Sequence, residues 1–560
     1  MNMQSQKWGH EQNWVINEIK TSNLGDKRLN KRLGNILELL AKQPEASISV
    51  KSNNWHEIKA AYRFFDNDVV DPIKILQPHY QAALKRIGTE KAVLIAQDTT
   101  ELDYSSKKAT VGIGKLHYEN HKGAFLHASI AVTPERICLG LVGAKFFTRD
   151  TLGKKDQQNI PIEDKESIRW LEGYNIANDI AIACPNTIIV SVADRECDIY
   201  EVLVASKANS GGAQWIIRNS KDRCLIDVGA TINDTNGIDN NISDTKNTKK
   251  DKLWKRLDRS AVIGTVEFDI NRTPKRKARH IKQEIKAVSV TLQSPHRKVC
   301  KIHDFTHTTE ANSVVIINNK VQFFDGINLY DANTNKLTKL QKAEFTDLQL
   351  ATDTIISKKL VAALFKEVDN IKQRLMLPPV TINAVMASEI DASEGVKPIE
   401  WVLLTSLPII TATECLQVVA WYLCRWQIEI FFKILKDGCK VEELQLQTLD
   451  RLTNCIAVYM IISWRILFMT MLGRACPDLP CTVVFSTEEW QTAYMMTYRM
   501  QPPTMPPTLN EMIIMVAGFG GFLKRKCDKN PGNQSLWVGI QRVRDFAAGI
   551  ALSNDINLVK

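Results

Sequence analysis

The sequence predicts an α/β protein in which helices cover a mixed β-sheet, with a β-rich insertion and a helical segment at each end of the chain. Three observations support this fold class. Short apolar runs that end in polar residues alternate with helix-forming stretches over residues 92–218. Residues 261–329 contain a second set of alternating β patterns, and helix-forming residues dominate from Glu414 to the end.

The composition is that of a folded protein with more than one core. The chain has 560 residues, 44% hydrophobic and 24% charged, which excludes a disordered protein and favours about three or four domains. The 72 Lys and Arg residues outnumber the 62 Asp and Glu residues, and the net charge of +10 permits a polyanionic partner without requiring one. The 12 cysteines include no C-x-x-C pair and no apolar signal core precedes them, so we expect reduced thiols in the cytoplasm.

The first 70 residues predict two short helices with basic faces. A turn at Asn23–Asp26 precedes a helix that carries Arg28 and Arg32, and a second helix at 55–65 carries Arg63. Paired helices of this kind are typical of small DNA-binding modules. The alternative is a charged face that only contacts solvent.

The predicted sheet begins after these helices. The expected elements are strands at 92–96, 125–132 and 137–147, a helix at 168–183, a strand at 187–193, a helix at 199–206 and a strand at 214–218. Three strands followed by alternating helices and strands indicate a mixed sheet covered by helices.

A largely β insertion is expected at about 231–375. It starts with a polar loop at 231–251, continues with β patterns at 261–288 and 314–329, and ends in a helix at 350–375. The basic run that includes Arg276 lies between strands and predicts either a phosphate-binding arm or a solvated hairpin. Strands at 381–387 and 401–405 then return to the core.

Two aspartates follow buried strands. Asp98 comes after the apolar run 92–96, and Asp194 comes after the run 187–193. In α/β sheets the carboxyl ends of strands are where sites are built, and paired carboxylates suit a hard cation such as Mg²⁺. Taken separately, each aspartate also fits an ordinary helix cap or loop.

A third candidate group lies in the segment WYLCRWQIEIFFKILK. We expect one helix here, with a single narrow polar stripe on an otherwise buried surface, because the polar residues recur every three or four positions. These residues are Tyr422, Arg425, Glu429, Lys433 and Lys436. One reading is a solvent-facing stripe with ion pairs four residues apart. The other is that the acid completes a metal site while the cations and the phenol hold phosphate oxygens.

Three carboxylates would define a reaction class. With two metal ions they support in-line phosphoryl displacement, in which one metal activates a water or a 3′-hydroxyl and the other stabilises the leaving oxygen. Because three clustered negative charges repel one another, metal binding is expected to be obligatory.

The same motifs resemble the insertion-sequence-four family of bacterial DDE transposases, and in particular its transposon-five branch. The resemblance rests on IAQDTT around Asp98, VADRE around Asp194 and the Tyr-x2-Arg-x3-Glu-x6-Lys signature. It extends in order to LGDKR at 24–28, AYRFF at 61–65, WVLLT at 401–405 and GGFL at 520–523, and so covers most of the chain.

This resemblance implies a ribonuclease-H-like catalytic core. It implies that Asp98, Asp194 and Glu429 form the metal-binding triad, with Mg²⁺ as cofactor and Mn²⁺ as a substitute. It also implies that the signature residues contact phosphates at the cleaved end; these are Tyr422, Arg425 and Lys436, with Lys433 on the same stripe. Trp401 would stack on a base turned out of the duplex, which offsets the cost of unstacking.

The expected partners are double-stranded DNA, as transposon ends and target, and a second copy of the chain in a synaptic homodimer. No membrane is expected, because the apolar stretch 455–472 contains Arg465 and fits a buried helix. The bacterial nucleoid is the expected location. The predicted units are an N-terminal DNA-binding domain at 1–70, core segments at 71–230 and 376–450 around the insertion at 231–375, and a C-terminal dimerisation domain at 451–560.

The predicted activity is cut-and-paste transposition through a hairpin intermediate. A related nuclease without strand transfer needs the same three acids, so only reaction products distinguish it. An inactive copy that acts as a DNA-binding repressor or inhibitor is the other alternative. About 300–372 has no counterpart that we can place in the family, and this keeps the second alternative open.

Overall fold

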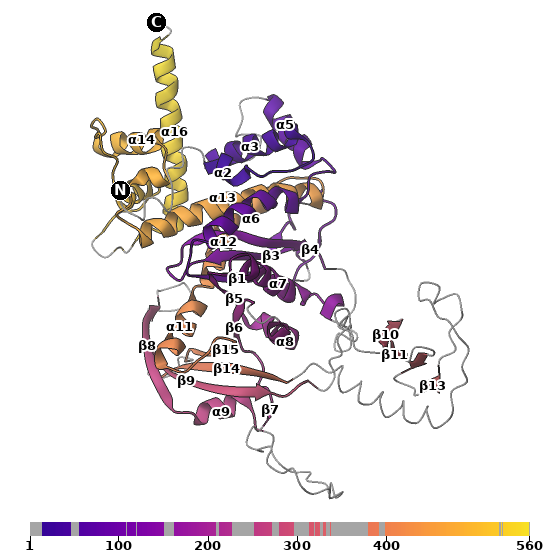
Figure 1. Ribbon diagram of the computed structural model, residues 1–560. Coiled ribbons are helices and arrows are strands. Elements are labelled where there is room, and N and C mark those ends of the chain that lie inside the picture. The colour runs from indigo at the N-terminus through magenta and orange to yellow at the C-terminus, as the bar shows by residue number, and fades with distance from the viewer. Residues whose placement is uncertain are drawn as a thin grey trace, which may run out of the picture.

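The computed structural model describes most of the chain. The described residues are 14–45, 55–107, 109–118, 120–149, 162–208, 212–226, 251–270, 279–295, 313–317, 320–324, 329–331, 336–337, 379–390, 398–525, 528 and 530–558. A large mixed sheet lies between helices, and further helices gather at one end of it (Figure 1). The α/β class predicted from the sequence is therefore confirmed.

The central sheet has 11 strands in the order β2-β3-β1-β5-β6-β15-β14-β9-β7, with β4 beside β3 and β8 beside β9. Strands β1, β5 and β6 pair in parallel, whereas β3, β15 and β14 join antiparallel. The bounds are β1 Ala92–Asp103, β2 Gly114–Lys115, β3 Lys122–Val132, β4 Cys138–Phe147, β5 Ile188–Ala193, β6 Gln214–Arg218, β7 Leu225–Ile226, β8 Val262–Ile270, β9 Arg279–Leu292, β14 Val380–Glu389 and β15 Glu400–Thr405.

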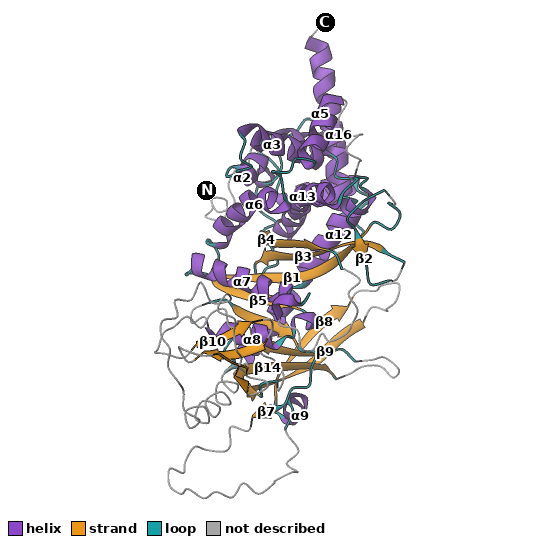
Figure 2. Cartoon of the chain, turned by 90° about the vertical axis from the view of Figure 1, so that its right-hand side faces the viewer, coloured by secondary structure: helices purple, strands orange, loops and turns teal. Residues whose placement is uncertain are grey.

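Part of the predicted insertion extends this sheet. Strand β9 pairs with the whole of β14 and also with β8. The short helix α9 (Leu253–Arg259) packs on β9. Four other strands form a separate sheet (Figure 1): β10 Ser313–Ile317, β11 Lys320–Phe324, β12 Leu329–Asp331 and β13 Lys336–Leu337. In Figure 2 the strands of the large sheet lie below the helices of the two ends of the chain. The helix predicted at 350–375 and the loop predicted at 231–251, apart from Asp251, lie outside the described residues.

Helices cover both faces of the parallel strands. Helices α7 (Ile168–Ala183) and α8 (Tyr200–Ala208) pack together on one face, and α11 (Ala412–Leu423) and α12 (Trp426–Lys433) lie on the other. Successive side chains of a strand point to opposite faces, so Gln97 meets α7 and Asp98 meets the turn before α12. Helix α7 approaches closely at Gly173, where a Cβ would lie 2.1 Å from the Gln97 amide oxygen.

The N-terminal helices pack against the same body. They are α2 Trp14–Ile19, α3 Lys27–Lys42, α5 Trp55–Phe65 and α6 Pro72–Ile87. The Asp26 carboxylate caps α3 by accepting the Arg28 N–H at 2.7 Å, as the predicted turn requires. Helix α6 packs on β4 and was not predicted, because Pro78 and several polar residues interrupt its apolar pattern.

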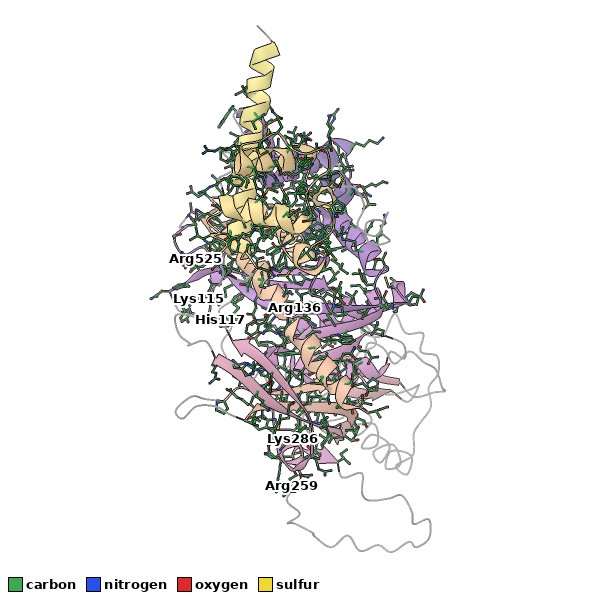
Figure 3. All side chains as sticks on the ribbon, turned by 90° about the vertical axis from the view of Figure 1, so that its left-hand side faces the viewer. Lys115, His117, Arg136, Arg259, Lys286 and Arg525 are labelled. Carbon is green, nitrogen blue, oxygen red and sulfur yellow. The ribbon has the colours of Figure 1, made fainter. Side chains whose placement is uncertain are left out.

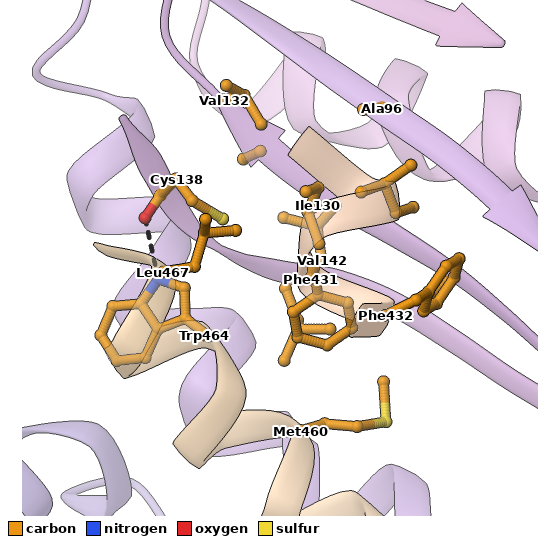
Figure 4. Close-up of a cluster of buried hydrophobic side chains, with 14 of the residues drawn as sticks. Ala96, Ile130, Val132, Cys138, Val142, Phe431, Phe432, Met460, Trp464 and Leu467 are labelled. Atoms are coloured by element: carbon orange, nitrogen blue, oxygen red, sulfur yellow. Dashed lines mark hydrogen bonds between the residues drawn. The ribbon is translucent and has the colours of Figure 1, made fainter. Parts of the chain in front are cut away.

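The long apolar helix is buried, as predicted. Helix α13 (Leu449–Ala475) is long and apolar enough to cross a membrane. Its most apolar stretch is, however, completely buried by other described parts of the chain. It packs against α6, α3 and β4. Figure 4 shows Met460 and Leu467 in this core, and the Trp464 indole N–H donating to the Cys138 carbonyl at 2.9 Å.

Three further helices complete the described C-terminal part. They are α14 Thr487–Tyr498, α15 Leu509–Phe519 and α16 Asn533–Leu558. Reciprocal capping boxes begin two of them, Ser486 with Glu489 at α14 and Thr508 with Glu511 at α15. The outer half of α16 projects away from the rest of the chain (Figure 1).

Candidate active site

Asp98 lies within β1, and Asp194 directly follows the neighbouring strand β5. Strands β1 and β5 pair in parallel up to Ala96 opposite Val192, and each aspartate lies two residues beyond that pair. Because side chains alternate along a strand, both aspartates continue the face that Ala96 and Val192 share. Asp194 also accepts the Glu196 N–H at 2.8 Å, which caps a short 3₁₀ turn and fixes the carboxylate.

The prediction that a strand ends before Asp98 is wrong. Strand β1 continues to Asp103, because β3 pairs with it antiparallel through Asp98 opposite Ala128 and as far as Asp103 opposite Gly123. The backbone hydrogen bonds between β1 and β3 hold this polar part of the chain in the sheet, so the strand continues beyond the apolar run. Asp98 therefore projects from a strand held on one side only, next to the point where β5 stops.

The prediction of one continuous signature helix is also wrong. Helix α11 ends at Leu423 and α12 starts at Trp426, with a tightened turn between them. In this turn the Arg425 N–H donates to the Tyr422 carbonyl at 3.0 Å, which is the 3₁₀ pattern. The turn lets Tyr422 and Arg425 bury against the sheet, whereas Glu429 and Lys433 remain exposed.

Arg425 joins the acid of the helix to the acid of the strand. One arm of its guanidinium donates to Asp98 Oδ2 at 2.7 Å, and the other donates to Glu429 Oε1 at 2.7 Å. Arg425 is only 8% exposed, whereas the side chains of Asp98 and Glu429 are 20% and 50% exposed. The structure thus brings two of the predicted acids to one guanidinium.

The charge of the third acid also acts on Asp98. Burial raises the pKa of Asp98, Arg425 and the Thr99 N–H oppose this rise, and the negative charges of Asp194 and Glu429 add to it, so that the pKa is about 6. Burial lowers the pKa of Arg425, but Tyr422, Asp98 and Glu429 outweigh this and raise it above its usual range. The site is therefore a buried cation between two acids, with the charge of a third acid acting on one of them.

The acids suit a divalent cation in donor type but not in their present arrangement. Among the described residues, no group of three or more His, Cys, Asp and Glu side chains stands ready to hold a metal. The guanidinium of Arg425 instead neutralises Asp98 and Glu429. All three acids offer the oxygen ligands that Mg²⁺ prefers, so their donor type fits this ion, but in this structure Asp98 and Glu429 are paired with Arg425.

Aromatic rings border the acids. The Tyr422 and Trp401 ring centroids lie 6.1 Å apart. Trp401 also stacks on Phe268, with centroids 5.9 Å apart and planes 11° apart. Tyr422 is buried, which raises the pKa of its phenol, and Arg425 lies 6.0 Å from its ring. Trp401 is partly exposed, so it borders solvent as well as this cluster.

The remaining signature lysines differ in environment. After α12 the helix widens into a π turn, Ile434–Gly438, and this turn directs Lys436 to the Glu101 carbonyl at 2.8 Å and to Glu442 at 3.0 Å. Lys433 is exposed on α12. Lys436 is therefore tied to the strand that bears Asp98, and Lys433 faces solvent.

Sequence reasoning missed an arginine behind the acids. Arg169 of α7 is buried and donates to the Thr99 hydroxyl and to the Glu196 carboxylate, both at 3.0 Å. Thr99 directly follows Asp98, and the backbone N–H of Glu196 donates to the Asp194 carboxylate. Arg169 thus connects the two segments that carry the aspartates. Its only sequence signal is a charge inside an apolar helix pattern.

The predicted DNA-binding arginines lie elsewhere. Arg28 and Arg32 are on α3, and Arg63 is on α5; Arg28 and Arg63 are exposed, and Arg32 is partly exposed. Arg276 lies outside the described residues. The N-terminal arginines therefore present charge on helices separate from the acids.

Three family models match the chain in order. Transposase DNA-binding matches residues 11–70, Transposase DDE domain matches residues 246–464, and Transposase Tn5 dimerisation domain matches residues 461–556. The DDE match includes Trp401 and the whole signature, and it begins after Asp98 and Asp194. With a DNA-binding, a DDE and a dimerisation unit in this order, the chain belongs to the insertion-sequence-four family of DDE transposases, with a Tn5-like architecture.

Proposed function

We propose that this transposase moves its element by cut and paste. It would bind the transposon ends, hydrolyse one strand, close the opposite strand into a hairpin, reopen the hairpin and join the freed 3′-ends to target DNA. The observation that carries the proposal is the Arg425 guanidinium held between Asp98 and Glu429, with Asp194 just after the end of the neighbouring strand β5 and its charge acting on Asp98. Two acids from distant segments thus meet at one buried cation, and the charge of a third acid acts on the first.

The chain's own groups have distinct roles in this reaction. Asp98, Asp194 and Glu429 would hold Mg²⁺, or Mn²⁺ in its place, which lowers the pKa of the attacking water or 3′-hydroxyl and stabilises the charge of an in-line displacement. Arg425, released from the two acids, donates to phosphate oxygens. Tyr422 stays protonated because burial raises its pKa, so it donates its O–H to the same phosphate. Lys436 keeps the π turn attached to β1 through the Glu101 carbonyl.

Hairpin formation requires a sharp bend in the DNA, and Trp401 is the residue that we assign to it. Trp401 stacks on Phe268 and is partly exposed, so a base turned out of the duplex would extend this aromatic stack. Base–aromatic stacking contributes roughly 1–3 kcal/mol per base, which offsets unstacking. Trp401→Ala should therefore reduce hairpin formation more than first-strand nicking. An equal loss in both steps would remove the stacking role.

The wider assembly follows from the matched units. Arg28, Arg32 and Arg63 would contact the transposon end, and the C-terminal unit would hold two copies together in a synaptic complex. The reaction would take place on the bacterial nucleoid.

The deciding experiment is incubation of the full chain with linear DNA that carries the element's own ends and Mg²⁺, with the products resolved on a denaturing gel. We expect a nicked product, then a hairpin, then joining to target DNA. Asp98→Ala, Asp194→Ala and Glu429→Ala should each abolish cleavage and retain end binding. Cleavage without hairpin or joining would favour the nuclease alternative, and end binding without cleavage by the unaltered chain would favour an inactive copy.

A further inference from the structure

A buried aspartate closes the turn that begins with Asp194. The residues Arg195–Cys197 form a short 3₁₀ turn, and the residues on either side of it are both aspartates. Asp194, at the start, is partly exposed at the candidate site, whereas Asp198, at the end, is only 1% exposed. We call residues 194–198 the Asp194 turn. Because only 3 residues separate the two aspartates, the position of Asp198 limits where Asp194 can lie.

Asp198 is held by the segment that follows β6. Its Oδ2 atom accepts the Ser220 N–H at 2.9 Å and the Ser220 hydroxyl at 3.1 Å, and the Asn219 amide donates to the same oxygen at 3.3 Å. The Arg223 guanidinium donates to Oδ1. The Asp198 backbone carbonyl accepts from Lys221 at 2.9 Å and from Arg223 at 3.1 Å. A carboxylate taken out of water requires partners of this kind, so these contacts hold Asp198 in one position.

The same segment is bound to the insertion. The Asn219 Oδ1 atom accepts the Trp254 indole N–H at 2.7 Å, and the Asp222 carboxylate accepts the Trp254 backbone N–H at 3.1 Å. Trp254 is the second residue of α9, whose buried side chains pack on β9. Hydrogen bonds therefore connect α9, through Asn219, to Asp198 at the end of the Asp194 turn.

The candidate site gives this anchoring a purpose. Asp98 lies in strand β1 and Glu429 in helix α12, where regular backbone hydrogen bonds hold them. Asp194 instead lies after the end of β5, on the turn itself. Metal ligands have to be held to within roughly 0.5 Å of their productive positions. Asp194 therefore depends on the contacts of its turn more than the other two acids do.

We propose that Asp198 and Trp254 are positioning residues for Asp194, so that the insertion helps to shape the metal site. This rests on the proposed function, because it assigns Asp194 to metal binding. Both residues act through the turn and not on the substrate. Arg169 of α7 holds the same turn at Glu196. With Asp198 bound on the side of the insertion, the turn is fixed at two points.

The first test measures Mn²⁺ binding to the full chain by calorimetry, without DNA. Trp254→Phe keeps an aromatic ring and removes only the indole N–H, and Trp254 is 41% exposed, so this variant should fold. The loss of one hydrogen bond that acts through Asn219 should weaken Mn²⁺ binding by about threefold. Asp198→Asn removes the charge that pairs with Arg223. It should weaken Mn²⁺ binding by about tenfold, the low end for residues that orient metal ligands.

Lys286→Gln is the matched control. Lys286 of β9 donates to the Asp258 carbonyl of α9 at 2.9 Å, so this variant also removes one hydrogen bond between α9 and its surroundings. That bond joins α9 to β9 and not to the segment that follows β6. In Figure 3, Lys286 lies near Arg259, the last residue of α9, at the lower end of the molecule. Lys286→Gln should leave the Mn²⁺ affinity unchanged.

Hydrogen exchange of the metal-free chain tests the connection in a second way. The N–H groups of residues 196–198 are all bonded within the Asp194 turn, so their exchange rates report how often the turn opens. Trp254→Phe should speed the exchange of these groups by about threefold. Lys286→Gln should leave their exchange unchanged.

Two results would overturn the proposal. One is equal Mn²⁺ affinity of Trp254→Phe and the unaltered chain, even with a lower melting temperature, because a purely structural contact would behave in this way. The other is faster exchange confined to α9, with the Asp194 turn unchanged. If Asp198→Asn does not fold, Trp254→Phe decides alone.

The result is separable from the proposed function. If the unaltered chain binds Mn²⁺ and cuts its ends, and Trp254→Phe does both equally well, the positioning role fails and the function stands. If the unaltered chain neither binds Mn²⁺ nor cuts DNA, the proposed function and the positioning role both fail, whatever the exchange rates show.

Discussion

The Arg425 guanidinium donates to the Asp98 carboxylate across 2.7 Å and thereby connects the signature helix to the central sheet. Its second arm reaches Glu429 at the same distance, so one side chain neutralises two acids that would otherwise repel each other. A divalent cation bound by these acids would compete with the guanidinium for both. Arg425 therefore acts as an internal counter-ion in the absence of metal.

Arg425→Gln should make the fold more dependent on metal. Without the guanidinium, Asp98 and Glu429 lose their charge-assisted hydrogen bonds, and we expect a loss of about 2 kcal/mol in unfolding free energy. Added Mg²⁺ should then raise the melting temperature of the variant more than that of the unaltered chain. Lys433→Gln, an exposed cation on the same helix, is the control. Equal Mg²⁺ shifts in all three proteins would contradict the counter-ion role.

Asp98→Asn should abolish cleavage and yet stabilise the free protein at neutral pH. Because the pKa of Asp98 in the folded protein, about 6, lies above the usual value of 3.8, the fold disfavours the ionised form, by up to about 3 kcal/mol. This unfavourable contribution is absent below pH 3.8 and complete above about pH 6. The variant's gain in melting temperature should therefore be present at pH 7.5 and disappear as the pH falls through that window. A variant less stable than the unaltered chain at pH 7.5 would refute this account.

Arg169 should act as a positioning residue for the two aspartates. Arg169→Gln removes the bonds to Thr99 and Glu196, which hold the segments after Asp98 and Asp194 together. Because residues that orient ligands typically affect metal affinity or activity by about 10–100-fold, we expect a loss of that size in cleavage rate. The metal concentration needed for half-maximal cleavage should rise, and Mn²⁺ affinity measured by calorimetry should fall.

The control for this experiment is Lys145→Gln. Lys145 also pairs with a carboxylate, that of Glu172 of α7 at 2.6 Å, but at the surface, and neither residue forms an ion pair with Arg169 in the part of the chain that the structure describes. It should leave the Mn²⁺ affinity unchanged. If Arg169→Gln lowered only the melting temperature, with the same Mn²⁺ affinity, its role would be merely structural.

The sequence predicted elements best where apolar periodicity decides the structure. Helix α7, helix α5 and strand β6 have the predicted bounds, because each shows a regular apolar pattern between polar turns. Strand β1 was predicted too short, since its second half is polar and depends on pairing with β3. Helix α6 was missed for a similar reason: its stability comes from packing on β4. Pairing and packing across the sheet are not encoded in local periodicity.

The candidate site was predicted in part. The spacing of four residues predicted the ion pair between Arg425 and Glu429. It did not predict that Arg425 is buried and also binds Asp98, 327 positions away. Arg169 donates to Thr99 and Glu196, which lie 70 and 27 positions from it in the sequence. No local spacing in the sequence indicates these contacts. Spacing in the sequence thus predicted which residues share a helix face, whereas contacts between different helices and strands could be identified only from the folded structure.

A buried carboxylate connects the N-terminal helix α2 to the core. Glu18 of α2 is buried and accepts hydrogen bonds at 2.6 Å from Arg86 and from the His79 Nδ1–H. The other nitrogen of His79 accepts the Leu141 N–H at 2.9 Å, which fixes the neutral tautomer. Burial lowers the pKa of His79, in keeping with a neutral ring. One carboxylate therefore ties α2 to α6, and through His79 to β4.

Glu18→Gln should destabilise the protein in a pH-dependent manner. Burial opposes the ionised form of Glu18, but His79 and Arg86 outweigh it and lower the pKa from 4.5 to about 2. Because the folded pKa is depressed, its stabilisation, about 3 kcal/mol, is complete above pH 4.5 and is lost as the pH falls through about 2. The difference in unfolding free energy between the variant and the unaltered chain should therefore be largest at neutral pH and shrink in acid. Glu443→Gln, which removes an exposed ion pair with Lys440, should change stability little at any pH. A Glu18 variant as stable as the Glu443 variant at pH 7 would show that this carboxylate does not hold the N-terminal helix to the core.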